Sequence, residues 1–176
     1  MILSPFDRAV EVERKGLHPF PLAPRSKVPQ KGFDLSEHFR RDVPVAEDVD
    51  WYIGGANLGV KTGELIVVDI DDKERARAFY KRLKSILKTI VETRRGAHFY
   101  FRSLSPGIAT ATLEDGDLKA EGGYVVIPDS RVDGWQYGFV PGHGLADLRE
   151  QPGFEPDMVT VCGGPQSVDH EVVHLR

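Results

Sequence analysis

Cysteine and long apolar segments are both scarce in this chain of 176 residues. Its single cysteine, Cys162, cannot form an internal disulfide or a zinc cluster, and such usage is typical of a reducing, cytoplasmic compartment. The longest apolar run, residues 65–68, is far shorter than the roughly 20 residues that a membrane-spanning helix needs. The N-terminus lacks the basic and then apolar pattern of a signal peptide. We therefore expect neither a disulfide-stabilised nor a membrane-embedded protein.

An excess of positive charge is missing as well. The chain has 23 Lys and Arg against 27 Asp and Glu, a formal net charge of -4, which disfavours binding of nucleic acid through a global basic field. Between residues 75 and 102, however, nine Lys or Arg accompany a single acid, Glu92. A nucleic-acid role therefore requires local basic surfaces, and a solvated helix face is the alternative explanation for this segment.

Hydrophobic periodicity predicts one domain in which antiparallel strands outnumber helices. Helices are predicted at residues 6–15, 34–40 and 72–90, and strands at 57–60, 65–71, 90–93, 97–102, 117–121, 124–127 and 135–139. The first two strands are expected to form a hairpin through a loop that contains a glycine. The pattern after residue 151 is ambiguous, with a short strand at 158–162 as one solution. Together these elements predict a mixed α/β fold of the α+β class.

Two acidic residues end the most apolar strand. Asp69 and Asp71 are two positions apart, so strand alternation puts both carboxylates on one face, about 7 Å apart along the chain. Such a pair offers the oxygen ligands that Mg²⁺ and Mn²⁺ prefer, with substrate phosphates completing the coordination shell. The alternative is a helix cap, in which Asp71 or Asp72 begins the next helix and Glu74 completes a capping box.

A histidine follows a short basic turn. Alternation in residues 97–102 assigns the alanine and the phenylalanines to the core and places His98 on the wetter face of the sheet. The preceding turn carries Arg94 and Arg95. Guanidinium groups match phosphate geometry and imidazole can donate to phosphate, so these side chains suit a triphosphate. A structurally hydrogen-bonded histidine is the alternative.

A third strand repeats this arrangement. Asp117, Lys119 and Glu121 alternate with apolar residues and therefore share one face. They offer a further metal carboxylate beside a cationic phosphate ligand. An ordinary solvated edge strand is the alternative, because alternating charges are common there.

The order of these motifs resembles the bifunctional primase-polymerase (prim-pol) family of the archaeo-eukaryotic primase superfamily, over residues 16–145. In chain order the motifs are a proline-flanked Lys27, an Asn-x-Gly strand, Asp-x-Asp, a helix, Thr-x-x-Gly-x-His, Asp-x-Lys and Gly-Gly-Tyr-Val-Val-x-Pro. The family's Pro-Pro-Ser is Pro128-Asp129-Ser130 here, which departs at the middle position. The resemblance implies an RRM-like, antiparallel-rich sheet with flanking helices as the catalytic core.

The resemblance also implies DNA-templated nucleotidyl transfer by two-metal-ion catalysis, in making primers, in extending them, or in both. Asp69, Asp71 and Asp117 would hold Mg²⁺ or Mn²⁺ and act in catalysis together with His98. Glu121 is a rival for the third carboxylate, because the family has a hydrophobic residue before it and Asp117 follows a glycine. The nucleoside triphosphate would be bound by His98, Thr93, Arg94, Arg95, Lys119 and Ser130.

Further residues are candidates for contacts with nucleic acid and with the nucleotide sugar. Template or initiating-nucleotide contacts are expected from Arg25, Lys27, Lys31 and Arg40. Discrimination between ribo- and deoxyribonucleotides commonly depends on one bulky aromatic side chain, for which Tyr100, Tyr124 and Phe139 are the candidates.

The expected organisation is a catalytic domain at residues 1–150, with an N-terminal α/β lobe at about 1–62. Residues 151–176 would form a C-terminal extension that packs on the domain or leads to a further region. The implied partners are a single-stranded DNA template and a replicative helicase on the same or another chain, in the cytoplasm of a prokaryotic, plasmid or viral replication system. The alternatives are a Mg²⁺-dependent nuclease or other phosphoryl-transfer enzyme, and a non-catalytic module that binds single-stranded nucleic acid.

Overall fold

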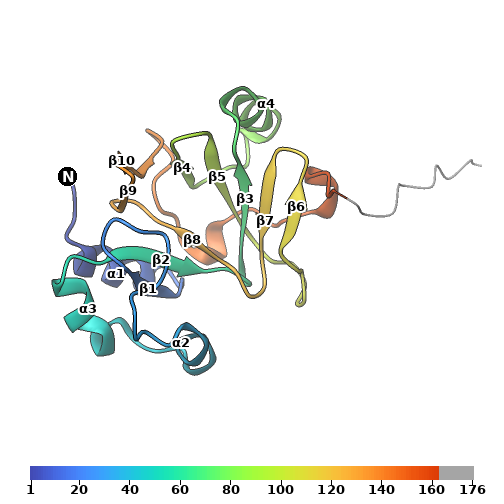
Figure 1. The fold of residues 1–176 in the computed structure, drawn as a ribbon. Coiled ribbons are helices and arrows are strands. Elements are labelled where there is room, and N and C mark those ends of the chain that lie inside the picture. Colours follow the sequence, from blue (N-terminus) through green and yellow to red (C-terminus); the bar gives the residue numbers. More distant parts are fainter. Residues whose placement is uncertain (163–176) are drawn as a thin grey trace, which may run out of the picture.

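The computed structural model describes residues 1–162, which contain four α-helices and three antiparallel sheets, of six, three and two strands (Figure 1). The helices are α1 (Pro5–Arg14), α2 (Leu35–Arg41), α3 (Val49–Ile53) and α4 (Lys73–Leu83), with 3-10 turns η1 (Val45–Asp48), η2 (Leu148–Glu150) and η3 (Pro156–Met158). The strands are β1 (Pro19–Leu22), β2 (Asn57–Lys61), β3 (Leu65–Ile70), β4 (Ile90–Glu92), β5 (Ala97–Arg102), β6 (Ala111–Leu113), β7 (Gly116–Lys119), β8 (Tyr124–Val126), β9 (Arg131–Val132), β10 (Trp135–Gln136) and β11 (Gly138–Phe139). The predicted mixed α/β fold, rich in antiparallel strands, is confirmed.

The larger sheet has six antiparallel strands in the order β11-β4-β5-β3-β7-β6. Its centre is β3, which pairs with β5 on one side and with β7 on the other. In Figure 1, α4 lies apart from α1, α2 and α3, which gather around β1 and β2. The large sheet therefore separates two packing regions.

Alternation along β3 divides the core between these two regions. Ile66, Val68 and Ile70 pack with α4, whereas Leu65 and Val67 face the core built with α1 and the smaller sheet. Because both faces of the large sheet are covered, the face of β5 that carries His98 is also buried. The expectation that His98 lies on a wetter face is wrong, since only 5% of it is exposed.

The smaller sheet has the order β1-β2-β8. Its first two strands come from the predicted N-terminal lobe, but β8 comes from residues that follow the segment with the acidic motifs. Later parts of the chain therefore complete the sheet of this lobe.

The predicted hairpin between residues 57–60 and 65–71 is wrong, because β2 and β3 belong to different sheets. Between them, the Thr62 N–H donates to the Gly123 carbonyl at 3.0 Å and its hydroxyl donates to the Ala120 carbonyl. Gly63 has a φ of 144°, which glycine adopts far more readily than other residues. The glycine therefore allows the chain to cross from one sheet to the other.

The strand predicted at 135–139 is split in the structure, since β10 pairs with β9 and β11 pairs with β4.

The helix predicted at residues 72–90 is shorter in the structure. The Asp72 side chain caps α4 by accepting the Arg75 N–H at 2.9 Å, and the helix ends at Leu83. Leu87 is still buried, and the Thr89 hydroxyl donates to the Gly144 carbonyl at 3.0 Å. The apolar periodicity therefore continues through turns that contact the core without helical backbone.

Residues 151–162 pack on the domain. The Gln151 amide donates to the Thr89 hydroxyl at 2.8 Å, and the Phe154 side chain is buried beside Phe101. The strand predicted at 158–162 is wrong, because η3 and an isolated bridge between Leu113 and Val161 replace it. Residues 163–176 of the predicted extension lie outside the described residues. No helix within residues 1–162 is long and apolar enough to cross a membrane.

Candidate active site

Three strands bring the central acidic and histidine side chains together. Asp69 on β3 lies directly opposite His98 on β5 and, on its other side, directly opposite Asp117 on β7. Residues paired in this way have Cβ atoms about 4.5–5.5 Å apart and point to the same face. The antiparallel pairing therefore aligns residues that are far apart in the sequence.

Asp69 and His98 are in contact within a largely buried environment. Nε2 of His98 is 3.5 Å from Oδ1 of Asp69, and their side chains are 7% and 18% exposed respectively. Burial raises the pKa of Asp69, but the contact with His98 and the charges of Lys119 and Lys27 outweigh it, so its pKa lies below the ordinary value. Asp69 is therefore ionised at neutral pH. Nδ1 of His98 is buried without a protein hydrogen-bond partner among the described residues.

The other two aspartates are paired with cations. Oδ1 of Asp71 lies 3.0 Å from a guanidinium nitrogen of Arg95, and Oδ2 of Asp117 accepts a hydrogen bond from Lys119 at 3.1 Å. Because Asp72 caps α4, Asp71 is not needed for that cap. The capping alternative therefore accounts for Asp72 and leaves Asp71 with its carboxylate near Arg95.

A cavity of about 410 Å³ opens beside this cluster. Its lining comprises Lys27, Asp69, Asp71, Thr93, Arg94, Arg95, His98, Val132, Asp133, Trp135 and Tyr137. Three carboxylates and the histidine thus share one cavity with three cationic side chains. That combination suits a ligand which carries both phosphates and a cation.

Sequence reasoning missed the aromatic side of this cavity. Trp135 and Tyr137 line it, and the Tyr137 ring lies 6.0 Å from that of His98 between centroids. Their spacing of two residues in an extended segment is the signal that could have identified a shared face. Nε1 of Trp135 is buried with no protein hydrogen-bond partner in residues 1–162.

The three aromatic residues expected to contact the nucleotide sugar lie elsewhere. Tyr100 is fully buried in the core, and the Tyr124 hydroxyl donates to the Lys27 carbonyl at 2.9 Å. The Phe139 ring lies 5.3 Å from the Arg8 guanidinium. None of them lines the cavity that contains Asp69.

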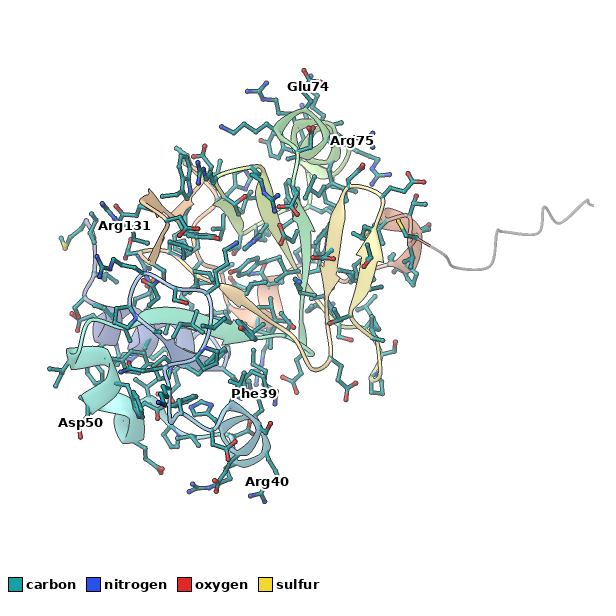
Figure 2. All side chains as sticks on the ribbon, in the orientation of Figure 1. Phe39, Arg40, Asp50, Glu74, Arg75 and Arg131 are labelled. Atoms are coloured by element: carbon teal, nitrogen blue, oxygen red, sulfur yellow. The ribbon has the colours of Figure 1, made fainter. Side chains whose placement is uncertain are left out.

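Several predicted contact residues are also outside this cavity. Glu121 lines a different cavity with Gly63 and Glu64. The Ser130 hydroxyl accepts the Leu58 N–H at 2.8 Å and lines a third cavity, together with Arg25. Lys31 and Arg40 are exposed, and Arg40 projects outward from α2 (Figure 2). Of the four predicted nucleic-acid contacts, the structure brings only Lys27 to the cavity.

The donor chemistry at this site fits a divalent cation whose coordination is completed by substrate. Within residues 1–162, no three side chains of the His, Cys, Asp and Glu types converge into a preformed metal site. Mg²⁺, however, is commonly held by one or two carboxylates plus waters and substrate phosphates. Asp69 is ionised, Asp117 is in register with it, and Asp71 lines the same cavity, so hard oxygen ligands are available.

Comparison with protein families agrees with this geometry. A family model described as bifunctional DNA primase/polymerase, N-terminal, matches residues 9–154. No curated protein matches the chain. The matched region runs from α1 to Phe154 and therefore includes all eleven strands named above. The chain thus belongs to the Prim-Pol family, the N-terminal domain of bifunctional DNA primase/polymerases.

Proposed function

We propose that this chain is a DNA-templated nucleotidyltransferase that synthesises primers on single-stranded DNA, extends them, or does both. One observation carries the proposal. Asp69 lies in register between His98 and Asp117, and it faces a cavity that Asp71 shares with Lys27, Arg94 and Arg95. Carboxylates and cations that meet in one cavity are what the transfer of a polyanionic nucleotide requires.

The basic residues of the cavity would bind and orient the triphosphate. Arg94 is exposed on the β4–β5 turn, and its guanidinium can bind a phosphate with two hydrogen bonds. The Thr93 hydroxyl accepts the Gly96 N–H at 3.0 Å and so stabilises this turn. Arg95, which pairs with Asp71, can exchange that carboxylate for phosphate oxygens. Catalysis of this kind depends mainly on positioning and on charge stabilisation.

The acidic residues would hold Mg²⁺ or Mn²⁺. Asp69, Asp71 and Asp117 are the proposed ligands, and the cationic neighbours of the last two, Arg95 and Lys119, must yield to a metal ion or move onto phosphate. When bound, such ions offset the charge that develops on the attacking and leaving oxygens. His98 would keep Asp69 oriented through Nε2 and offer Nδ1 to the substrate.

The same proposal extends to the fold and the partners. The six-stranded antiparallel sheet with α4 on one face is compatible with the RRM-like core of archaeo-eukaryotic primases. Residues 1–150, with the segment through Phe154 packed on them, would form the catalytic domain, acting in the cytoplasm with a single-stranded DNA template and a helicase on the same or another chain.

The test compares wild-type protein with Asp69→Asn on unprimed and primed single-stranded templates, with labelled nucleoside triphosphates and Mg²⁺ or Mn²⁺. We expect Asp69→Asn to lower incorporation by roughly 10²-fold or more, because the nearly isosteric amide cannot replace the anionic ligand. Asp50→Asn is the matched control. Asp50 is exposed on α3 and lies far from α4 (Figure 2), so incorporation should match that of the wild type.

The products separate the competing functions. Oligonucleotides made on the unprimed template indicate a primase, and extension of the primed template alone indicates a polymerase. Degradation of labelled DNA without nucleoside triphosphates would favour a nuclease. Template binding without incorporation under either metal would overturn the catalytic proposal in favour of a binding module.

A further inference from the structure

The cations of α4 divide into two groups with different surroundings. On one flank, Arg75 is paired with Asp115, and the Arg82 guanidinium donates to the Met158 carbonyl. Both therefore attach the helix to the β6–β7 turn and to the C-terminal segment. The positive charges of Arg75 and Arg82 are therefore engaged in contacts within the protein.

The other flank carries the cations Lys73, Arg77, Lys81 and Lys84, which we call the basic flank. Their spacing of four, four and three residues places them along one side of the helix and its C-cap residue, about 100° to 180° around the axis from Arg75 and Arg82. All four are exposed. None forms an ion pair with any other residue of the described part of the chain. The basic flank is therefore a row of uncompensated positive charge.

The basic flank begins at the cavity that contains Asp69. Nζ of Lys73 lies 6.0 Å from the centroid of the Trp135 ring, and Trp135 lines that cavity. The β4–β5 turn lies against the start of the helix, because a Cβ on Gly96 would fall 3.1 Å from the Asp72 nitrogen. From Lys73 to Lys84 the helix rises about 16 Å. Positive charge therefore continues from Arg94 and Arg95 along α4.

We propose that the basic flank binds the sugar-phosphate backbone of the single-stranded DNA engaged at the cavity. This inference rests on the proposed function, since it takes nucleic acid to be the ligand there. Regularly spaced cations along an exposed helix neutralise successive phosphates and release their counterions, which stabilises binding without regard to base sequence. The net charge of -4 is thereby reconciled with DNA binding, because the positive charge is concentrated where the strand runs.

The test uses two variants with equal change in net charge. In the first, Arg77→Gln, Lys81→Gln and Lys84→Gln are combined, which leaves Lys73 and the cavity intact. In the matched control, Arg14→Gln, Arg41→Gln and Arg149→Gln remove three exposed cations from other elements. Glutamine has nearly the helix propensity of lysine and arginine, so α4 should persist, as circular dichroism and thermal unfolding would check.

The primary measurement is the dissociation constant for a fluorescent 30-nucleotide single strand across a series of salt concentrations, without metal or triphosphate. We expect the basic-flank variant to bind roughly tenfold or more weakly at 50 mM salt. The slope of log K against log salt should decrease by roughly 2, at about 0.7 per cation removed. The control variant should follow the wild type.

Equal weakening in both variants would overturn the proposal, because it would reflect net charge alone. Unchanged binding by the basic-flank variant would overturn it as well, because it would show that the strand does not contact these cations. The outcome does not depend on catalysis. If the wild-type protein incorporates no nucleotide, and the basic-flank variant still weakens salt-dependent DNA binding, the proposed function is wrong. The inference that DNA binds along α4 then stands.

Discussion

At the scale of single residues, Tyr137 combines an apolar ring with a hydroxyl close to the acidic pair. Burial raises the pKa of Tyr137, and the charges of Asp69 and Asp71 raise it further against the opposing effect of Arg95. The hydroxyl therefore keeps its proton through neutral and mildly alkaline pH, and it can donate a hydrogen bond. The ring forms part of the cavity wall, and we propose that the sugar of a bound nucleotide packs against it.

We predict that Tyr137→Ala changes the ratio of ribo- to deoxyribonucleotide incorporation by roughly tenfold or more. The substitution removes the ring that would contact the 2′-position of the sugar, where the two kinds of nucleotide differ by one hydroxyl group. Discrimination of one such group in a binding pocket is worth about 1–3 kcal/mol. The measurement is kcat/KM for matched ribo- and deoxyribonucleoside triphosphates on one primed template.

Tyr137→Phe is the control for that prediction, since it keeps the ring and removes only the hydroxyl. Its ratio should stay within about threefold of the wild type if the ring provides the discrimination. An unchanged ratio in Tyr137→Ala would show that another side chain selects the sugar.

At the scale of elements, the β4–β5 turn is positioned by a close backbone contact. A Cβ on Gly96 would lie 1.8 Å from the Ile70 carbonyl oxygen, a separation that no side chain can occupy. The glycine therefore lets the turn that carries Arg94 and Arg95 approach the end of β3. This contact determines how near the basic turn lies to Asp71.

We predict that Gly96→Ala lowers the free energy of unfolding by about 1–3 kcal/mol, because the backbone must shift to admit the methyl group. Urea unfolding followed by fluorescence measures the change. Nucleotide incorporation should fall as well, since the same shift moves the arginines away from Asp71. Gly144→Ala is the matched control, because a Cβ there meets nothing within 4 Å. A stable, fully active Gly96→Ala protein would contradict this account.

At the scale of the whole molecule, the segment after residue 150 belongs to the core. Phe154 is 2% exposed, and its ring lies 6.0 Å from that of Phe101 on the face of the large sheet covered by α4. Its N–H donates to the Arg102 carbonyl at 2.9 Å. The family match therefore ends at residue 154, whose side chain is part of the core that covers the large sheet.

We predict that Phe154→Ala lowers the free energy of unfolding by about 3–5 kcal/mol, the usual cost of removing a buried phenylalanine. Denaturant unfolding measures this loss. Val161→Ala in the same segment is the control, and it should change stability by less than about 0.5 kcal/mol because Val161 is 42% exposed. A loss for Phe154→Ala as small as that for Val161→Ala would mean that the Phe154 side chain does not contribute to the core.

Local patterns predicted much of this arrangement, because they depend on interactions between near neighbours. Strand alternation placed Asp69 and Asp71 on one face, and both line the cavity. The turn before His98 was likewise predicted from neighbouring residues. The helix at α4 was predicted from its apolar spacing, but its end was misplaced, since Leu87 keeps that spacing in a non-helical turn. The crossover at Gly63 was also missed, because a glycine permits a hairpin and a crossover equally.

The sequence by itself determined the mixed α/β class, the residue types able to bind metal and phosphate, and the family to which the chain belongs. Only the tertiary structure decided which of these residues meet. It brought Asp117 rather than Glu121 opposite Asp69, and it put Ser130 against the backbone of β2. It also brought Tyr137 to the cavity. The physical reason is strand register, which is set by packing on both faces of a sheet between segments that are distant in the chain.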